Sequence, residues 1–401
     1  MNKTLGTLFL AAGILGLAQS CSTLSKVELE EGEYILDSYK IEVKDNRFFN
    51  VSELSPYVRQ KPDKQLFNKS TTILDRRAAA LSRTAISERL AKLGYYGAKV
   101  DTAVSYNGSK AKLTYVVELG ERIPVDSVIY RLPDSPEFRE DFMADSSKVL
   151  VRPGDYLSEV TMEEEIARSV EALRRKGYYS IDQSHYRFQA DTNSKGGHAN
   201  VFYEIPRPVY KSYIGKVSVS YPEDLKVRES VLRGMNLIRP GDLYDSRKVS
   251  NTYSRFSSLR VFQTVGVNLT QVDSTTVDCN ISLTQSKLQG FKTNLEMSTN
   301  SSGLIGISPR LGYYHKNIFG GGEWLSIGFS GNFQFMIDSD TRATEIGTSA
   351  SLSLPKFLGL GYDRFKGSSV PRTEFNLSFS HQNRPEYTRN LFSGSFGYTG
   401  T

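Results

Sequence analysis

The chain has 401 residues, and its 50 basic and 44 acidic residues interleave along its length to give a formal net charge of +6. No basic tract stands out, which excludes a nucleic-acid-binding surface built on clustered lysine and arginine. The length allows three or four domains of about 100–150 residues. Two cysteines are too few for a secreted scaffold held together by disulfides.

The first residues have the pattern of a secretory signal peptide. A short positive start precedes the apolar stretch Thr4–Ala18, and small residues lead to Cys21. Ser20-Cys21 is similar to the cleavage site of a bacterial lipoprotein, although Ala18-Gln19-Ser20 departs from the usual Leu-Ala-Gly pattern. We therefore expect an acylated Cys21, the alternative being ordinary cleavage that leaves a free thiol. No later apolar run is long enough to form a transmembrane helix.

Three consecutive stretches then repeat one order of elements, in which a strand precedes a helical region and two further strands. The elements expected in the first stretch are a strand, a helix and two strands, at 34–43, 75–93, 99–106 and 111–118. Those of the second are a strand, a helix and two strands, at 124–130, 161–176, 185–190 and 198–205. Those of the third, more diverged stretch are a strand, two helices and two strands, at 214–221, 226–234, 245–260, 264–271 and 276–286. Each stretch is interpreted as a β-α-α-β-β unit.

Two short motifs recur between the stretches. The helices of the first two stretches end at Gly94-Tyr95-Tyr96 and Gly177-Tyr178-Tyr179, where the glycine is best explained as a helix stop with positive φ and the tyrosines as packing residues. Glu163–Glu165 is expected in the first turn of the second stretch's helix, where the helix dipole favours acidic residues. The second motif is Arg152-Pro153-Gly154-Asp155, which returns as Arg239-Pro240-Gly241-Asp242.

Six segments from Phe291 onward alternate apolar and polar residues, as a strand with one apolar and one polar face does. The segments are 291–299, 304–314, 323–335, 345–354, 372–381 and 391–399. In 323–335 the apolar face carries Leu325, Ile327, Phe329, Phe333 and Phe335. Membrane β-strands need about 9–11 residues, whereas strands of a soluble β-sandwich, the alternative, usually have about 5–6. The pattern therefore favours an antiparallel transmembrane sheet of six strands.

Catalytic and metal-binding motifs are absent from the sequence. There is no His-Glu-x-x-His, Gly-x-Ser-x-Gly or phosphate-binding glycine loop, and the run Gly320–Gly322 is expected to be a hairpin or a site of close approach. Cys279 alternates with apolar residues and is expected to be buried and inert. The four histidines share no ligand spacing; they are His185, His198, His315 and His381. We expect no enzyme, no cofactor and no metal site.

These features together resemble the POTRA-plus-β-barrel outer-membrane assembly family, the BamA/TamA-like surface antigens. The lipoprotein start and Gly32-Glu33-Tyr34-Ile35-Leu36 are most similar to lipid-anchored TamA-like members of Bacteroidetes. Two adjoining segments resemble strands of the family's barrel, Ser308-Pro309-Arg310-Leu311-Gly312-Tyr313 and Asn317-Ile318-Phe319-Gly320-Gly321-Gly322-Glu323. The expected fold is α+β, with tandem POTRA repeats followed by an incomplete antiparallel transmembrane β-barrel of about six strands. Its expected parts are a signal peptide, a lipidated linker, three POTRA-like repeats and part of a barrel, at 1–20, 21–32, 33–119, 120–209, 210–288 and 289–401.

The resemblance implies an outer-membrane assembly or translocation factor whose repeats lie in the periplasm. Its partners would be unfolded outer-membrane protein clients bound by strand addition, outer-membrane lipid and a TamB-like inner-membrane partner, with no nucleic acid. Six strands are fewer than the sixteen of the family's barrels, so a truncated chain is expected. Two alternatives stay open: a lipid-anchored periplasmic polypeptide-binding protein, and a secretion pore of the two-partner type.

Overall fold

The computed structural model describes residues 29–63, 70–192, 196–299, 304–336 and 341–400. The predicted signal peptide and Cys21 lie outside the described residues. Contacts divide the chain into two compact units, and the division runs through the second repeat. Residues 132–147, 167–185 and those from 205 onward belong to the second unit, and the other residues belong to the first. No helix in the described ranges is both long enough and apolar enough to cross a membrane.

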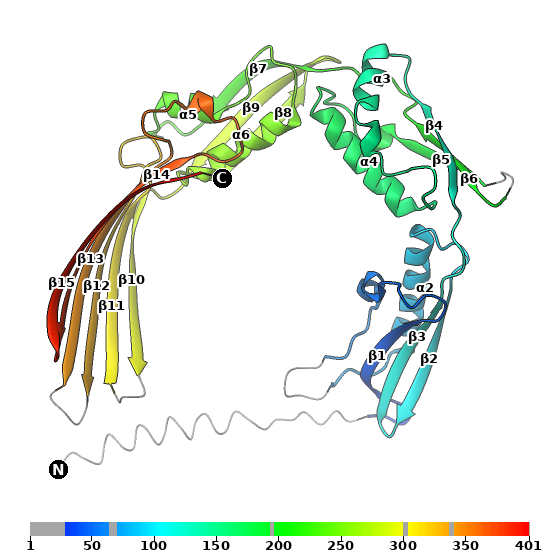
Figure 1. Cartoon of the computed structure of the whole chain (residues 1–401), viewed down its shortest axis with the longest axis horizontal. Coiled ribbons are helices and arrows are strands. Elements are labelled where there is room, and N and C mark those ends of the chain that lie inside the picture. The colour runs from blue at the N-terminus through cyan, green and yellow to red at the C-terminus, as the bar shows by residue number, and fades with distance from the viewer. Residues whose placement is uncertain (1–28, 64–69, 193–195, 300–303, 337–340, 401) are drawn as a thin grey trace. The chain divides into compact units, whose positions relative to one another are not determined.

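The first repeat forms a three-stranded sheet of order β1-β3-β2, in which β1 runs parallel to the central β3 (Figure 1). Its elements are β1 (Ile35–Val43), α2 (Arg76–Lys92), β2 (Lys99–Asn107) and β3 (Lys110–Glu118). Asp75 caps α2 by accepting a hydrogen bond from the N–H of Arg77. The fully buried Ile86 and Leu90 of α2 belong to the same core cluster as Leu113 of β3.

The expected first helix of this repeat is replaced by two single 3₁₀ turns, Val51–Glu53 and Ser55–Tyr57. The predicted β-α-α-β-β order is therefore wrong for the first repeat, whose described residues between β1 and α2 form 3₁₀ turns and no α-helix. A continuous α-helix from Val51 would place Pro56 in its interior, where proline removes a main-chain hydrogen bond and clashes with the preceding turn. Each short turn instead closes separately, and Asn50 accepts from the N–H of Ser52.

The second repeat contains β4 (Val125–Arg131), α3 (Pro136–Met143), α4 (Glu159–Arg174), β5 (Arg187–Asp191) and β6 (Ala199–Glu204). Its sheet has the order β4-β6-β5, again with the first strand parallel to the third. Helix α4 begins at Glu159, so the prediction that Glu163–Glu165 occupies its first turn is wrong. Glu165 is instead fully buried, and its carboxylate accepts from the N–H of Leu150 and the hydroxyl of Tyr203.

The third repeat contains β7 (Tyr213–Ser220), α5 (Glu229–Met235), α6 (Ser246–Ser258), β8 (Phe262–Gln271) and β9 (Thr276–Gln285), with the sheet order β7-β9-β8. Its core is formed by buried side chains of both helices and the central strand, among them Leu232, Met235, Phe256 and Ile281. The two helices lie beside each other in Figure 1.

Six long antiparallel strands follow in sequential order: β10 (Gln289–Thr299), β11 (Leu304–His315), β12 (Trp324–Met336), β13 (Arg342–Leu354), β14 (Arg372–Arg384) and β15 (Tyr387–Thr399). Among the described strands, β10 pairs only with β11 and β15 only with β14, so the sheet is not closed. The expected fold class is confirmed: POTRA-like α+β repeats precede an incomplete antiparallel sheet of six strands.

Candidate functional site

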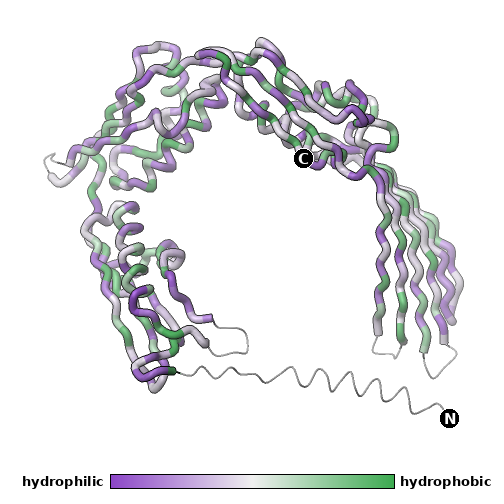
Figure 2. Tube along the Cα trace, turned by 180° about the vertical axis from the view of Figure 1, so that it is seen from behind, coloured by the Kyte–Doolittle hydropathy of each residue, from purple (hydrophilic) through white to green (hydrophobic). Residues whose placement is uncertain are grey.

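The pairing register of the six strands separates the sheet into an apolar face and a polar face. Directly opposed residues share a face, so each row across the sheet lies on one face. One mainly apolar row joins Thr293, Leu311, Phe329, Thr348, Phe379 and Phe392. A neighbouring polar row joins Lys292, Gly312, Gly328, Ser349, Ser378 and Ser393. Figure 2 shows the same alternation along the strands.

The polar face is connected by side-chain hydrogen bonds between strands. Ser351 of β13 donates to Asn376 of β14 at 2.7 Å, and Asn376 donates in turn to Ser395 of β15 at 3.3 Å. Glu345 accepts from both Ser380 and Gln382. On the apolar face the described side chains form isolated pairs, such as Tyr313 with Gln289 and His381 with Asn390. Its large side chains are left uncovered, with Phe291 74% and Phe392 75% exposed.

Aromatic side chains gather at the end of the sheet that adjoins the third repeat. On the apolar face, the rings of Phe291 and Tyr313 lie 5.2 Å apart, and those of Phe396 and Tyr398 lie 5.0 Å apart. On the polar face, Trp324 stacks on Tyr314 at 5.2 Å. Aromatic belts of this kind mark the water–lipid boundary of membrane strands.

The first strand of every repeat has the start of its outer edge covered by the segment that precedes the second helix. In the first repeat the N–H of Leu36 donates to the carbonyl of Thr72 at 2.7 Å. In the second, Val125 donates to Asp155 at 2.7 Å, and in the third, Ile214 donates to Asp242 at 2.8 Å. Among the described residues, the second strand of each repeat pairs with no other strand on its outer edge, although in the third repeat the hydroxyl of Tyr179 donates to the carbonyl of Leu269 in β8.

The outer edge of β2 is the clearest open edge. Asn107 and Lys110 close a two-residue hairpin with Gly108 at φ +59°, so these two residues form a hydrogen-bonded pair, as do alternate positions back along the strand. The N–H and C=O groups of Thr102 and Val104 therefore point outward. Edge strands are usually protected by proline, lysine or a bulge, and Thr102–Ser105 has none of these.

The connection between β11 and β12 is fastened to the third repeat by a buried carboxylate. Glu323 is 3% exposed, and its Oε1 accepts from Nη2 of Arg228 at 2.8 Å. Its Oε2 accepts from the N–H groups of Phe319 and Gly321. Asn317 adds a hydrogen bond to the carbonyl of Lys226 at 2.8 Å. Both oxygens of the buried carboxylate thus accept hydrogen bonds, which hold the turn in shape and join it to the third repeat.

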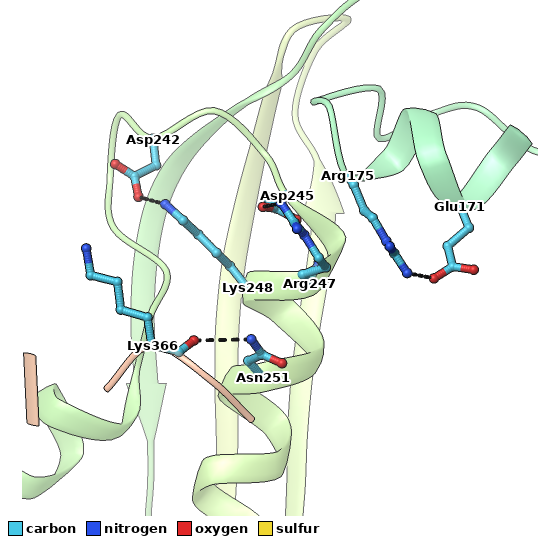
Figure 3. Close-up of polar contacts among 8 residues, drawn as sticks. All are labelled: Glu171, Arg175, Asp242, Asp245, Arg247, Lys248, Asn251 and Lys366. Atoms are coloured by element: carbon cyan, nitrogen blue, oxygen red, sulfur yellow. Dashed lines mark hydrogen bonds and ion pairs between the residues drawn. The ribbon is translucent and has the colours of Figure 1, made fainter. Parts of the chain in front are cut away.

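The connection between β13 and β14 is fastened by a buried arginine. Arg255 of α6 is fully buried, and its guanidinium donates to the carbonyls of Phe365, Gly367 and Gly234. Asn251 donates to the carbonyl of Lys366 at 3.2 Å (Figure 3). Burial lowers the pKa of Arg255, because removal from water disfavours the charged form. Main-chain carbonyls compensate Nη1 and Nη2, whereas the buried Nε has no hydrogen-bond partner among the described residues.

A close approach between α5 and the same connection explains a glycine within a helix. An added Cβ at Gly234 would lie 2.8 Å from Cγ and Cδ2 and 2.9 Å from Cβ of Tyr362. These are the atoms of Tyr362 nearest its backbone, so they cannot move aside independently. Only glycine lets the ring pack flat against this part of α5.

The residues singled out by sequence reasoning do not converge on a chemical centre. His185 binds Asp182, whereas His381 binds Asn390 on another element. Cys279 is a free thiol that is 2% exposed, and burial raises its pKa to about 11. In the described part of the chain, no three histidine, cysteine or acidic residues are grouped so as to hold a metal ion.

The recurring motifs have structural roles. Gly94 and Gly177 adopt φ of +94° and +111°, which confirms the helix stops. Tyr178 is buried, as predicted for a packing residue, and its hydroxyl donates to Asp141. The packing prediction is wrong for Tyr96, which is 51% exposed. Gly322 is at a close approach, with Leu259 only 3.2 Å from an added Cβ.

Sequence reasoning missed the residues that join the sheet to the third repeat. Arg255 lies within an amphipathic helix, where an arginine is expected to face solvent, and Glu323 follows a glycine run that carries no periodic signal. Glu323 pairs with the side chain of Arg228, 95 positions earlier, and Arg255 bonds the main-chain carbonyls of Phe365 and Gly367, 110 and 112 positions later. The glycine-rich composition of the two connections was the one available signal.

No protein-family model matches the chain, and no curated protein matches it. Among solved structures, it is similar to BamA from Haemophilus ducreyi lacking POTRA domains 1–3, with 12% identity and a TM-score of 0.40 over 68% of this chain and 58% of that one. It is also similar to POTRA3–5 of Haemophilus influenzae BamA, with 15% identity and a TM-score of 0.37 over 65% of this chain and 99% of that one. A third similar structure is CdiB from Acinetobacter baumannii, with 12% identity and a TM-score of 0.32 over 88% of this chain and 68% of that one. The chain thus spans less than two thirds of the first of these structures.

Gly234→Ala tests the packing of α5 against the connection that follows β13. In an uncrowded helix this change stabilises by roughly 0.5–1 kcal/mol. Here we expect destabilisation of about 1–3 kcal/mol, because the added methyl overlaps Tyr362. Limited proteolysis of the full chain, with cleavage between residues 355 and 371 mapped by mass spectrometry, measures the loss of docking. Tyr362→Ala is the matched partner for a double-mutant cycle, and purely additive effects would show that the two residues do not interact.

Proposed function

We propose that this chain is a membrane-embedded factor that assists the assembly or translocation of outer-membrane proteins and binds extended client segments by strand addition. The observation that carries the proposal is a two-faced sheet of long strands that follows three small repeats, the first of which has an open strand edge at β2. The sheet supplies a surface suited to lipid, and the repeats supply backbone groups suited to an unfolded polypeptide.

The apolar face supports membrane embedding. Its strands have 11 to 13 residues, at or above the roughly 9–11 needed to cross a bilayer. Large aromatic and aliphatic side chains that are exposed to water at this density would cause aggregation, but they are stable against lipid acyl chains. The opposite face carries serine, glycine, asparagine and charged residues, which suits a water-filled or protein-lined interior.

The open edge of β2 supports client binding. Pairing through main-chain groups places few demands on the client's sequence, as a factor with many unfolded clients requires. Coverage of the first strand in each repeat by its own chain leaves the second strand as the site of addition. The large sheet offers a further unpaired edge at β10, next to the third repeat.

The finer parts of the proposal rest on the sequence. The resemblance supports a location in the bacterial outer membrane with the repeats in the periplasm, a TamB-like inner-membrane partner, and kinship with lipid-anchored TamA-like proteins of Bacteroidetes. The apolar stretch before Cys21 supports a signal peptide and lipidation of that cysteine. The pattern of strands and helices supports repeat boundaries at 33–119, 120–209 and 210–288.

Paired lysine substitutions in β14 test the membrane face. Leu377 lies on the apolar face and is 53% exposed, whereas the next residue, Ser378, lies on the polar face between Ser349 and Ser393. We expect Leu377→Lys to destabilise membrane integration by about 2–4 kcal/mol, as a lysine near the bilayer midplane does, and Ser378→Lys to have little effect. The measurement is the fraction of full chain that resists carbonate extraction from the membrane. Equal effects of both substitutions would contradict the assigned faces.

Substitutions at Thr102 test strand addition at β2. Thr102→Pro removes an outward N–H without removing a bond to β3, so binding of an extended client peptide should weaken at least about fivefold, the equivalent of one hydrogen bond. Thr102→Val keeps the N–H and is the matched control. Fluorescence anisotropy with a labelled peptide from an outer-membrane strand reports the affinity, and circular dichroism confirms folding. Unchanged affinity in the proline variant would place the client elsewhere.

Cys21→Ala tests the lipid anchor. Three acyl chains exceed the two membrane signals needed for stable attachment. We expect the wild-type chain, but not the variant, to carry the mass of an N-terminal lipid in intact-mass spectrometry. An unmodified Cys21 in the wild-type protein would refute lipidation and would leave the membrane role of the sheet unaffected.

A further inference from the structure

A cavity of about 360 Å³ lies where the third repeat meets the connection between β13 and β14. The third repeat contributes Arg239, Asp242 and Lys248, and the connection contributes Tyr362 and Lys366. All of these residues lie in the same compact unit. The cavity is thus built from two segments that are far apart in the chain. With Asn236 of the third repeat it has six polar side chains, three of which are cationic.

The wall that carries Lys366 is held in place by its backbone. Arg255 donates to the carbonyls on either side, those of Phe365 and Gly367, and Asn251 donates to the carbonyl of Lys366 itself. Lys366 is therefore fixed at its main chain while its long side chain is free to approach a ligand. Figure 3 shows it on the same side of α6 as Lys248 and Asp242.

The described side chains leave the cavity positively charged. Lys248 and Asp242 neutralise each other in an ion pair of 2.7 Å. Arg239 donates only to the carbonyls of Ile238 and Arg233, and among the described residues no hydrogen bond or ion pair is recorded for the ammonium of Lys366. Two cations thus face the cavity without a carboxylate partner. An anionic ligand would supply the negative charge that these two cations lack.

The corresponding cavity of the second repeat has a different set of cationic side chains. It holds Arg152 and Asp155, the counterparts of Arg239 and Asp242, together with Arg122. The guanidinium of Arg122 is engaged, because it lies 4.1 Å from the ring centre of Tyr156. That cavity contains no lysine, so the uncompensated ammonium is specific to the cavity beside the sheet.

We propose that this cavity binds a phosphate group, with Lys366 and Arg239 as its cationic ligands. Guanidinium and ammonium groups are the usual partners of phosphate, and a tyrosine hydroxyl can complete the donor set. The cavity lies at the end of the sheet where its aromatic residues gather. If the sheet spans a membrane as proposed above, this end is at the level of the lipid headgroups, and an anionic phospholipid is the expected source of the phosphate.

The experiment uses the full chain purified in detergent. Native mass spectrometry measures retention of phosphatidylglycerol against phosphatidylcholine, and calorimetry measures binding of inorganic phosphate. We expect preferential retention of phosphatidylglycerol and about tenfold weaker retention in Lys366→Gln, because one charge-assisted hydrogen bond is lost. Lys356→Gln is the matched control: it makes the same charge change in the same connection, and Lys356 does not line the cavity.

The outcomes separate the sources of phosphate and the two levels of the proposal. Lipid retention that is sensitive to Lys366→Gln but not to Lys356→Gln supports a headgroup site. Calorimetric binding of inorganic phosphate alone, with the same sensitivity, supports a site for free phosphate. Equal effects of the two substitutions, or no binding in either measurement, overturn the site. The phosphate site and the proposed membrane function can fail separately. Phosphate binding can be absent while Leu377→Lys and Ser378→Lys still differ in membrane integration. Phosphate binding in detergent can also be present when those two variants do not differ.

Discussion

Every backbone N–H and C=O group of a β-strand needs a hydrogen-bond partner, and this requirement decides where the chain can meet other molecules. Strands β11 to β14 are paired on both sides, and the first strands β1, β4 and β7 are partly covered by their own repeats. Unpaired main-chain groups are thereby concentrated on a few edges, those of β2, β8 and β10 among them. A missing partner is costly inside a bilayer and tolerable in water. Under the proposed membrane location the edge of β10 therefore needs a neighbour, whereas that of β2 can stay open in water.

The joint between the third repeat and the sheet depends on buried charge. Glu323 and Arg255 are each withdrawn from water, and each is compensated mainly by main-chain groups of the segment that it holds. Removal of either side chain would leave several buried polar groups unpaired, which costs more than loss of an apolar contact. Such networks favour a single arrangement of α6 and the connection that precedes β14.

Sequence reasoning succeeded where the signal was periodic. The alternation in 323–335 predicted β12 at Trp324–Met336, and the stripe in 75–93 predicted α2 at Arg76–Lys92. It failed where a local feature outweighed the repeat, as at Pro56, and it gave no residue range for the first helix of the second repeat, α3, which is only two turns long. It could not find Arg255 or Glu323, because their partners are carbonyl and N–H groups that every residue carries. Side-chain patterns give no information on such main-chain contacts.

The recurring Arg-Pro-Gly-Asp motif covers the edge of a first strand through its main chain, and its side chains can in addition line a cavity. In both repeats its glycine and aspartate bond the first strand through main-chain atoms, and in the first repeat Thr72 and Leu74 do the same with different side chains. The edge-covering role therefore constrains the backbone and leaves the side chains free to differ. In the third repeat Arg239 and Asp242 face a cavity whose opposite wall is the connection to β14, and there Lys366 supplies a charge that the second repeat lacks. A segment required for the fold of each repeat thus lines a cavity in both the second and the third repeat, and the cavity beside the sheet is the one that also carries lysines.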